Sequence, residues 1–182
     1  VGDVMYDSII HFKKFSRKPI IKNKNNFILA TIHRSENIKN PNNLKNIFQS
    51  LNHISSDMQV IVPIHPNTKN KVKKLNINTN KLSLISPVSY FEMIWLIQNC
   101  KIVITDSGGL QKEAYFLNKI CLTLRSETEW IELIEMGVNF LAGTNKKEII
   151  KKYKKIFKKK IYFQNSKVYG SGNTSEKIIK AI

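Results

Sequence analysis

With 182 residues and 42% hydrophobic content, the chain can bury the core of one domain, which excludes wholesale disorder. No apolar run approaches the roughly 20 residues that span a bilayer, and residues 1–4 carry no secretory pattern. Lys and Arg number 30 against 13 acidic residues, a formal net charge of +17, so phosphate-bearing partners, including nucleic acid, must be considered.

Most of the basic residues are lysines that stand among asparagines, as in residues 21–26. This composition indicates an A-rich coding bias acting on solvated faces, and no recognition helix or RNA-binding strand accompanies it. We therefore expect no nucleic-acid partner, with a basic nucleic-acid-binding module kept as an alternative. Cys100 and Cys121 lie inside apolar segments without metal-ligand spacing. They predict buried free thiols and a cytoplasmic protein without a membrane partner.

The first 25 residues differ in pattern from the rest of the chain. Residues 3–15 have the pattern of a helix, and the polar, proline-containing residues 16–26 have the pattern of a linker. We interpret residues 1–25 as an interdomain crossover helix and linker from a missing upstream domain. Residues 26–182 are then one domain that ends in a helix.

Short β-rich runs alternate with longer helical patterns from residue 26 onward. The predicted strands are 27–32, 59–64, 82–85, 101–105, 120–124 and 139–141. The predicted helices between them are 42–54, 67–75, 90–99, 109–117 and 129–135. This alternation favours an α/β fold: a parallel sheet with helices on both faces, which binds ligands outside the carboxyl ends of its strands.

Two more helices are predicted in the C-terminal part. Residues 146–160 form an amphipathic pattern that turns apolar positions to the core and lysines outward. The apolar positions are Ile149, Ile150, Tyr153, Ile156 and Phe157. After an irregular segment, a terminal helix follows with Asn173 or Thr174 as its N-cap.

The strongest chemical signal is the turn Ser107-Gly108-Gly109, which lies between a buried strand and a helix. Glycines let the backbone approach a ligand, and the free N–H groups at a helix start favour a phosphate. Glu113 follows in the helix, where its carboxylate could accept hydrogen bonds from two ribose hydroxyls. The alternative is a helix capped by Asp106 or Ser107, with Glu113 as a solvated charge.

Two further strand ends carry histidines. His33 and Arg34 follow the first predicted strand, where Arg34 offers a planar fork to phosphate and His33 can exchange a proton. His65 follows the second strand, with Pro66 at a favoured first helical position. The alternatives are a structural His33 and a turn histidine at position 65 that is satisfied by the backbone.

Arg125 follows the strand after the Ser-Gly-Gly helix and can neighbour the same phosphate site. Alternatively, Arg125 pairs with a surface acid and Thr128 caps the next helix. Because four separate strand ends each offer phosphate-compatible groups, we expect them to meet on one rim and bind a phosphate-rich nucleotide.

These segments together resemble the C-terminal half of the non-hydrolysing UDP-N-acetylglucosamine 2-epimerase family. The family's T-x-H-R-x-E-N segment is matched at residues 31–37, its His-Pro pair at 65–66, its T-D-S-G-G-x-Q-x-E-A signature at 105–114 and its R-x-x-T-E segment at 125–129. Residues 2–7 look like the family's crossover into its second domain.

The resemblance implies a GT-B architecture of two Rossmann-like domains, of which this chain is the C-terminal, UDP-binding one. It implies inversion at C2 of the sugar by elimination and re-addition of UDP, with His33 as the catalytic residue that assists the leaving group. Ser107, Gly108, Gly109 and Arg125 would bind the phosphates and Glu113 the ribose, with His65 and Arg34 also at the substrate. No metal or cofactor is implied, and the full-length protein would be a homodimer.

The same resemblance implies that the family's essential carboxylates belong to the missing domain, so this chain should bind UDP weakly and not epimerise alone. The common T-E-R-P-E continuation is replaced here by residues 128–132, Thr-Glu-Trp-Ile-Glu. This variant looks more like relatives acting on UDP-2,3-diacetamido-uronic acids for surface-polysaccharide precursors. Met93 stands where the family often has an aromatic residue near the base. A GT-B glycosyltransferase or a hydrolysing epimerase remains an alternative.

Overall fold

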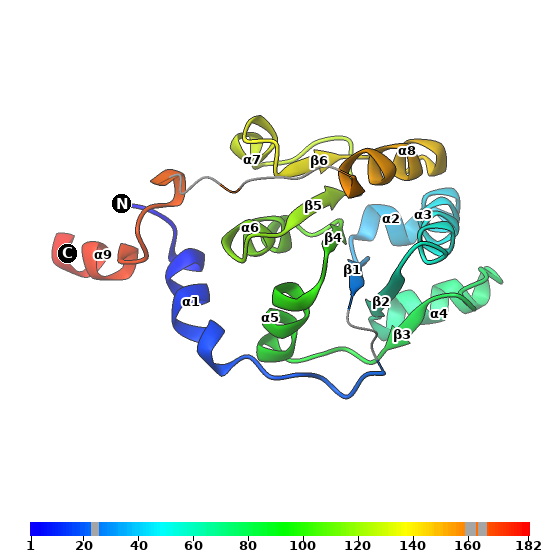
Figure 1. Ribbon diagram of the computed structural model, residues 1–182, viewed down its shortest axis with the longest axis horizontal. Helices are drawn as coiled ribbons and strands as arrows, with labels where there is room; N and C mark the ends of the chain where they lie inside the picture. Colours follow the sequence, from blue (N-terminus) through cyan, green and yellow to red (C-terminus); the bar gives the residue numbers. More distant parts are fainter. Residues whose placement is uncertain (23–25, 159–162, 164–166) are drawn as a thin grey trace.

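The computed structural model describes residues 1–22, 26–158, 163 and 167–182, which contain one six-stranded parallel sheet (Figure 1). Its strands follow the order β3-β2-β1-β4-β5-β6. Their bounds are β1 Phe27–Thr31, β2 Gln59–Pro63, β3 Ser83–Ile85, β4 Ile102–Thr105, β5 Ile120–Thr123 and β6 Asn139–Leu141. Every predicted strand is therefore confirmed, with ends that differ by one residue at most.

The strand order reverses between β1 and β4. The chain moves outward from β1 through β2 to β3, then returns to pair β4 with the other edge of β1, in register Leu29 with Val103 and Thr31 with Thr105. The loops after β1 and β4 leave the sheet in opposite directions at this point, which opens a crevice above the carboxyl ends of the strands.

Helices cover both faces of the sheet (Figure 1). Their bounds are α1 Val4–Phe12, α2 Ser35–Lys39, α3 Pro41–Ile54, α4 Pro66–Lys74, α5 Tyr90–Asn99, α6 Gly108–Phe116, α7 Ile131–Glu135, α8 Lys146–Phe157 and α9 Thr174–Ala181. Two 3₁₀ turns add η1 Lys13–Phe15 and η2 Lys167–Tyr169. Within the described part of the chain, none of these helices has the length and apolar character needed to cross a bilayer.

Successive side chains of β1 point to opposite faces of the sheet and join two separate hydrophobic clusters. Ile28 and Ala30 face one side, where they join a cluster with α3, α4 and α8, while Phe27 and Leu29 join a cluster with α5 and α6 on the other side. Because both faces of the strand are covered, all five β1 residues are buried. The predicted α/β fold is confirmed.

The helix predictions are confirmed in place and differ at their ends. Helix α8 begins at Lys146 as predicted and ends at Phe157, while residues 159 and 160 lie outside the described residues, as do 23–25 of the predicted linker. Asn173 precedes α9 as predicted but makes no capping hydrogen bond with its side chain. Instead Asp7 of α1 accepts hydrogen bonds from the backbone N–H and the hydroxyl of Ser175.

The N-terminal segment packs against the helix that follows the Ser107-Gly108-Gly109 turn and against the C-terminal helix. Helix α1 contacts α6 and α9, with Ile9 buried. Asp3 caps α1, and its carboxylate pairs with the buried ammonium group of Lys112 in α6. The start of the chain is thereby fixed to the helix that follows β4.

Candidate functional site

A buried aspartate ties together the two strand ends at the point where the sheet reverses. Thr31 and Thr105 end β1 and β4, with their hydroxyl oxygens 2.7 Å apart. Asp106 comes next and has no exposed surface. Its carboxylate accepts the backbone N–H groups of His33 and Arg34, both at 3.1 Å, and the side-chain amide of Asn37 at 3.0 Å. The loop after β1 therefore has its conformation set by the residue after β4.

The Ser-Gly-Gly turn opens helix α6. Ser107 is the N-cap: its hydroxyl accepts the backbone N–H of Leu110 at 3.4 Å, and its own N–H donates to the Thr105 hydroxyl at 3.0 Å. The alternative in which Ser107 caps the helix is thus correct. Asp106 does not cap the helix but accepts hydrogen bonds from the loop after β1. Gly108 lies close to Glu129, because a Cβ there would be 3.4 Å from Glu129 Oε2.

A cavity of about 460 Å³ lies above the carboxyl ends of β1, β2, β3 and β4. His33, His65 and Ser107 share it, each from a different strand end. The remaining lining is largely apolar and includes Val88 and Met93. A cavity with apolar walls and a few convergent polar groups at a switch point is the usual form of a nucleotide site in this fold class.

The two histidines enter this cavity differently. The His33 side chain is 53% exposed, and its Nδ1 lies 3.9 Å from Asp106 Oδ1. His65 is the N-cap of α4, where its Nδ1 accepts the backbone N–H of Asn67 at 3.2 Å. A neutral His65 ring therefore carries its proton on Nε2, which is available to a ligand. The interpretation of His65 as a turn histidine is correct for its bond to the backbone. His65 also lines the cavity, so one side of its ring remains open to a ligand.

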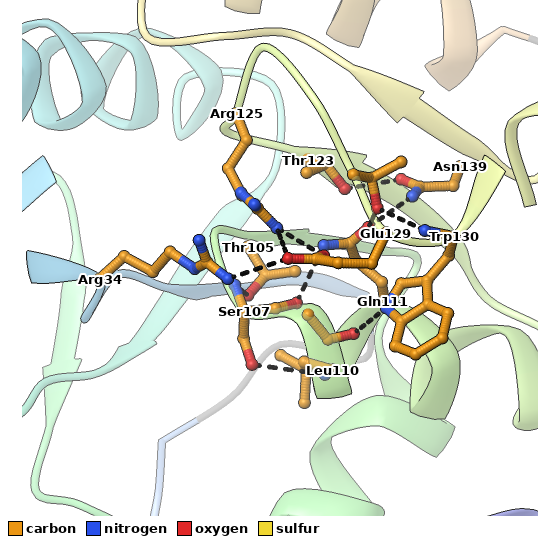
Figure 2. Close-up of polar contacts among 12 residues, drawn as sticks. Arg34, Thr105, Ser107, Leu110, Gln111, Thr123, Arg125, Glu129, Trp130 and Asn139 are labelled. Carbon is orange, nitrogen blue, oxygen red and sulfur yellow. Dashed lines mark hydrogen bonds and ion pairs between the residues drawn. The ribbon is translucent and has the colours of Figure 1, made fainter. Parts of the chain in front are cut away.

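Arg34 and Arg125 meet at a single carboxylate, that of Glu129 (Figure 2). Glu129 lies 3.2 Å from Arg34 Nη2 and 2.7 Å from Arg125 Nη1, and Glu36 lies 3.8 Å from both guanidinium groups. The hydrogen bond from Arg125 is the main cause that lowers the pKa of Glu129 to about 2. The same bond raises the pKa of Arg125.

Arg125 does not line the cavity of His33 and Ser107. Its side chain is 7% exposed and borders an adjoining hollow of about 210 Å³ with Glu36 and Thr144. The expectation that all four strand ends share one hollow therefore holds for β1, β2 and β4, while the end of β5 reaches the site through Glu129. The interpretation of Arg125 as the partner of an acid matches this geometry.

Glu113 is not the solvated charge of the alternative interpretation. It lies in α6 and is half-buried, and this burial raises the pKa of its carboxyl group to about 7. No hydrogen bond to its carboxylate is found among the described residues. Its charge is close enough to add to the burial that raises the pKa of the Tyr90 hydroxyl. A poorly solvated carboxylate without donors is suited to receive hydroxyl groups from a ligand.

A chain of buried polar groups fixes the loop that carries Glu129 (Figure 2). The Gln111 side-chain oxygen accepts from the Thr128 hydroxyl at 2.6 Å and from the Asn139 amide at 2.8 Å, and Thr123 donates to Asn139 at 2.7 Å. The Trp130 indole N–H donates to the Gly108 carbonyl at 2.9 Å. Both neighbours of Glu129 are thus fastened to α6.

No three His, Cys, Asp or Glu side chains of the described residues gather closely enough to hold a metal ion. His33, His65 and Ser107 line the cavity, and the N–H groups that start α6 lie beside it. The guanidinium groups of Arg34 and Arg125 are held next to the cavity by Glu129 and Glu36. Together they suit a phosphate-bearing ligand that also offers hydroxyls.

The sequence model of the UDP-N-acetylglucosamine 2-epimerase family matches residues 1–182. The chain belongs to this family. It is 41% identical over 180 residues to a UDP-2,3-diacetamido-2,3-dideoxy-D-glucuronate 2-epimerase of Pseudomonas aeruginosa, covering 98% of this chain and 50% of that protein. It is 42% identical over 194 residues to a UDP-N-acetylglucosamine 2-epimerase homolog of Methanococcus maripaludis, covering 100% and 53%.

A solved 2-epimerase has the same fold. The crystal structure of Methanocaldococcus jannaschii UDP-GlcNAc 2-epimerase in complex with UDP-GlcNAc and UDP superimposes with a TM-score of 0.89 at 34% identity, covering 100% of this chain and 53% of that chain. The chain spans about half the length of the curated relatives it matches. The prediction of a Rossmann-like domain of this family is confirmed.

Two features of this 2-epimerase family site were not predicted. The role of Asp106 had a local signal, since a buried strand runs directly into a carboxylate. The hydrogen bonds of the Gln111 side chain had no such signal, because its partners Thr128 and Asn139 come from later segments that only the folded sheet brings together.

Proposed function

We propose that the chain is the UDP-binding half of a UDP-N-acetylglucosamine 2-epimerase, or of an epimerase for a related UDP-2-acetamido sugar. The reaction inverts C2 by elimination and re-addition of UDP, in the synthesis of surface-polysaccharide precursors. The observation that carries this proposal is the cavity shared by His33, His65 and Ser107 at the sheet reversal, beside the start of helix α6.

The site divides into groups for phosphate and groups for ribose. The N–H groups of Gly108 and Gly109, which start the nine-residue helix α6, and the hydroxyl of Ser107 would receive the diphosphate. Arg34 and Arg125 would add positive charge from the neighbouring strand ends. Glu113 would accept two ribose hydroxyls, which supply the donors that its carboxylate lacks among the described residues.

His33 is proposed to assist departure of UDP. Elimination places developing negative charge on the phosphate oxygen, and a proton or a hydrogen bond from an imidazole stabilises it. Asp106 accepts the backbone N–H of His33 and lies 3.9 Å from its Nδ1. The aspartate therefore fixes the backbone of His33 and lies beside its ring.

The sugar is proposed to be a UDP-2-acetamido sugar, with the UDP-2,3-diacetamido-uronic acids as the favoured branch. The name of the P. aeruginosa relative and the Trp130-Ile131 variant support that branch. Residues 1–25 are proposed to be the crossover from another domain, since α1 packs on α6 and α9. A homodimer is proposed for the longer protein. A cytoplasmic location without a nucleic-acid partner is also proposed, and the buried free thiols of Cys100 and Cys121 support that location.

Calorimetric titration with UDP tests the binding half. We expect weak, saturable binding to the 182-residue chain and a loss of about tenfold in Glu113→Ala, because two ribose hydrogen bonds to a charged group are removed. Unchanged affinity in Glu113→Ala and in Ser107→Ala would contradict the proposed site.

The reaction is tested by substituting this chain for the matching half of the M. jannaschii enzyme and incubating the chimera with UDP-GlcNAc in D₂O. We expect deuterium at C2 and recovery of UDP-sugar epimers by NMR. Accumulation of UDP with free N-acetylmannosamine would indicate a hydrolysing epimerase, and transfer to an added acceptor a glycosyltransferase.

A further inference from the structure

The protein places a carboxylate of its own between its two site arginines. Glu129 Oε1 lies 3.2 Å from Arg34 Nη2, and its two oxygens lie 3.0 and 2.7 Å from Arg125 Nη1. Glu129 also lies near Gly108, where a Cβ would be 3.4 Å from Oε2. Groups from the ends of β1, β4 and β5 thus surround one negative charge.

We propose that Glu129 is a resident anion, which occupies the arginines in the free protein and which a ligand phosphate displaces. This inference rests on the proposed function, since it concerns the same phosphate site. Carboxylate and phosphate oxygens match the planar guanidinium fork in the same way. The position that suits Glu129 therefore suits a phosphate oxygen, and Glu129 is a positioning residue that sets how tightly the site binds its ligand.

The surroundings of Glu129 allow its side chain to leave while its backbone stays in place. The side chain is 47% exposed, so a rotation about its own bonds reaches solvent. Thr128 is held by Gln111, and Trp130 is held by the Thr128 hydroxyl at 3.2 Å and by the Gly108 carbonyl. Displacement thus requires a change of rotamer and no movement of the loop.

Competition, rather than protonation, releases the arginines. The hydrogen bond from Arg125 lowers the pKa of Glu129 to about 2, so the carboxylate is charged throughout the neutral range. A second anion must therefore replace it, and the energy of the two ion pairs is subtracted from the affinity for that anion.

The test compares Glu129→Ala with Glu127→Ala in calorimetric titrations of the 182-residue chain with UDP and, separately, with inorganic pyrophosphate. Glu127 lies in the same loop, forms no ion pair with the described residues, and its replacement removes the same charge. We expect both probes to bind Glu129→Ala about 3- to 10-fold more tightly than the wild type, and Glu127→Ala within about twofold of it. If the alanine variant is poorly folded, Glu129→Gln replaces it, because glutamine keeps the size of the side chain. Glu129→Gln should likewise bind both probes more tightly than the wild type.

Weaker or unchanged binding of both probes to the Glu129 variants would overturn the inference, because Glu129 would then hold Arg125 in place for the ligand. If pyrophosphate binds Glu129→Ala more tightly than the wild type, and UDP binds neither, the inference about Glu129 is supported and the proposed nucleotide function is refuted. If UDP binds the wild type and binds Glu129→Ala less tightly, the function stands and the inference fails. Absence of binding by every variant to both probes overturns both.

Discussion

Replacing Glu113 by glutamine should stabilise the chain at pH 8 much more than at pH 5. Burial raises the pKa of Glu113 from 4.5 to about 7. Between these two values the native state keeps a proton that the unfolded chain has lost, and above pH 7 the native state must hold a poorly solvated charge. Stability contributed by this residue therefore falls as the pH rises from about 4.5 to 7. Glutamine does not titrate and escapes this loss.

The size of the effect depends on the shift in pKa. One unit corresponds to about 1.4 kcal/mol, so the full shift would amount to about 3 kcal/mol. Glu113 keeps some contact with solvent, which reduces the effect. We expect the advantage of Glu113→Gln in the free energy of unfolding to grow by about 1–3 kcal/mol between pH 5 and pH 8.

Urea denaturation of the wild type and Glu113→Gln at both pH values measures this difference. Glu135→Gln is the matched control, because Glu135 is exposed and ends helix α7. Its free energy of unfolding should differ from that of the wild type by the same small amount at pH 5 and pH 8. An equal gap for Glu113→Gln at the two pH values would refute the reasoning, since a neutral packing effect does not depend on pH.

Three further predictions concern the same site. The affinity for UDP should rise about fivefold or more from pH 6 to pH 8 as Glu113 ionises, and a flat calorimetric profile would contradict its role. Asp106→Asn should lower the free energy of unfolding by about 2 kcal/mol, because one oxygen that accepts N–H groups becomes a donor; denaturation with no change in midpoint would exclude this. UDP should alter the fluorescence of Trp95→Phe and not that of Trp130→Phe, because Trp130 donates to the Gly108 carbonyl of the turn; the reverse pattern would place the ligand elsewhere.

The sheet was predictable because each strand has a local signal. β1 and β4 are short apolar runs that end in polar turns, and both faces of each are covered in the structure. Helix α2 was missed because it has five residues and begins at Ser35 without a side-chain cap. Its position depends on Asn37, which donates to the distant Asp106. The helix predicted from Glu129 begins two residues later, at Ile131, because Thr128 bonds Gln111 and the backbone of Trp130.

The sequence allowed us to predict which strand ends form the site. It did not allow us to predict which side chains contact one another there. Parallel strands place their carboxyl ends on one edge, so His33, His65 and Ser107 could be brought together from the pattern alone. The direction of the Arg125 side chain could not be predicted, because it depends on its ion pair with Glu129. Glu129 lies four residues further along a loop whose conformation no local sequence pattern indicates. The raised pKa of Glu113 likewise depends on burial by the folded chain.

The contacts of the free site explain why this half alone should bind UDP weakly. Most groups proposed for the ligand already have partners: Ser107 caps α6, Arg34 and Arg125 hold Glu129, and His65 accepts the N–H of Asn67. A ligand must exchange these contacts for its own, and only the surplus contributes to affinity. Glu113 is the exception, because its carboxylate has no donor among the described residues and burial disfavours its charge. Most of the affinity for a nucleotide should therefore come from the ribose end, so uridine should retain a larger share of the binding free energy than pyrophosphate.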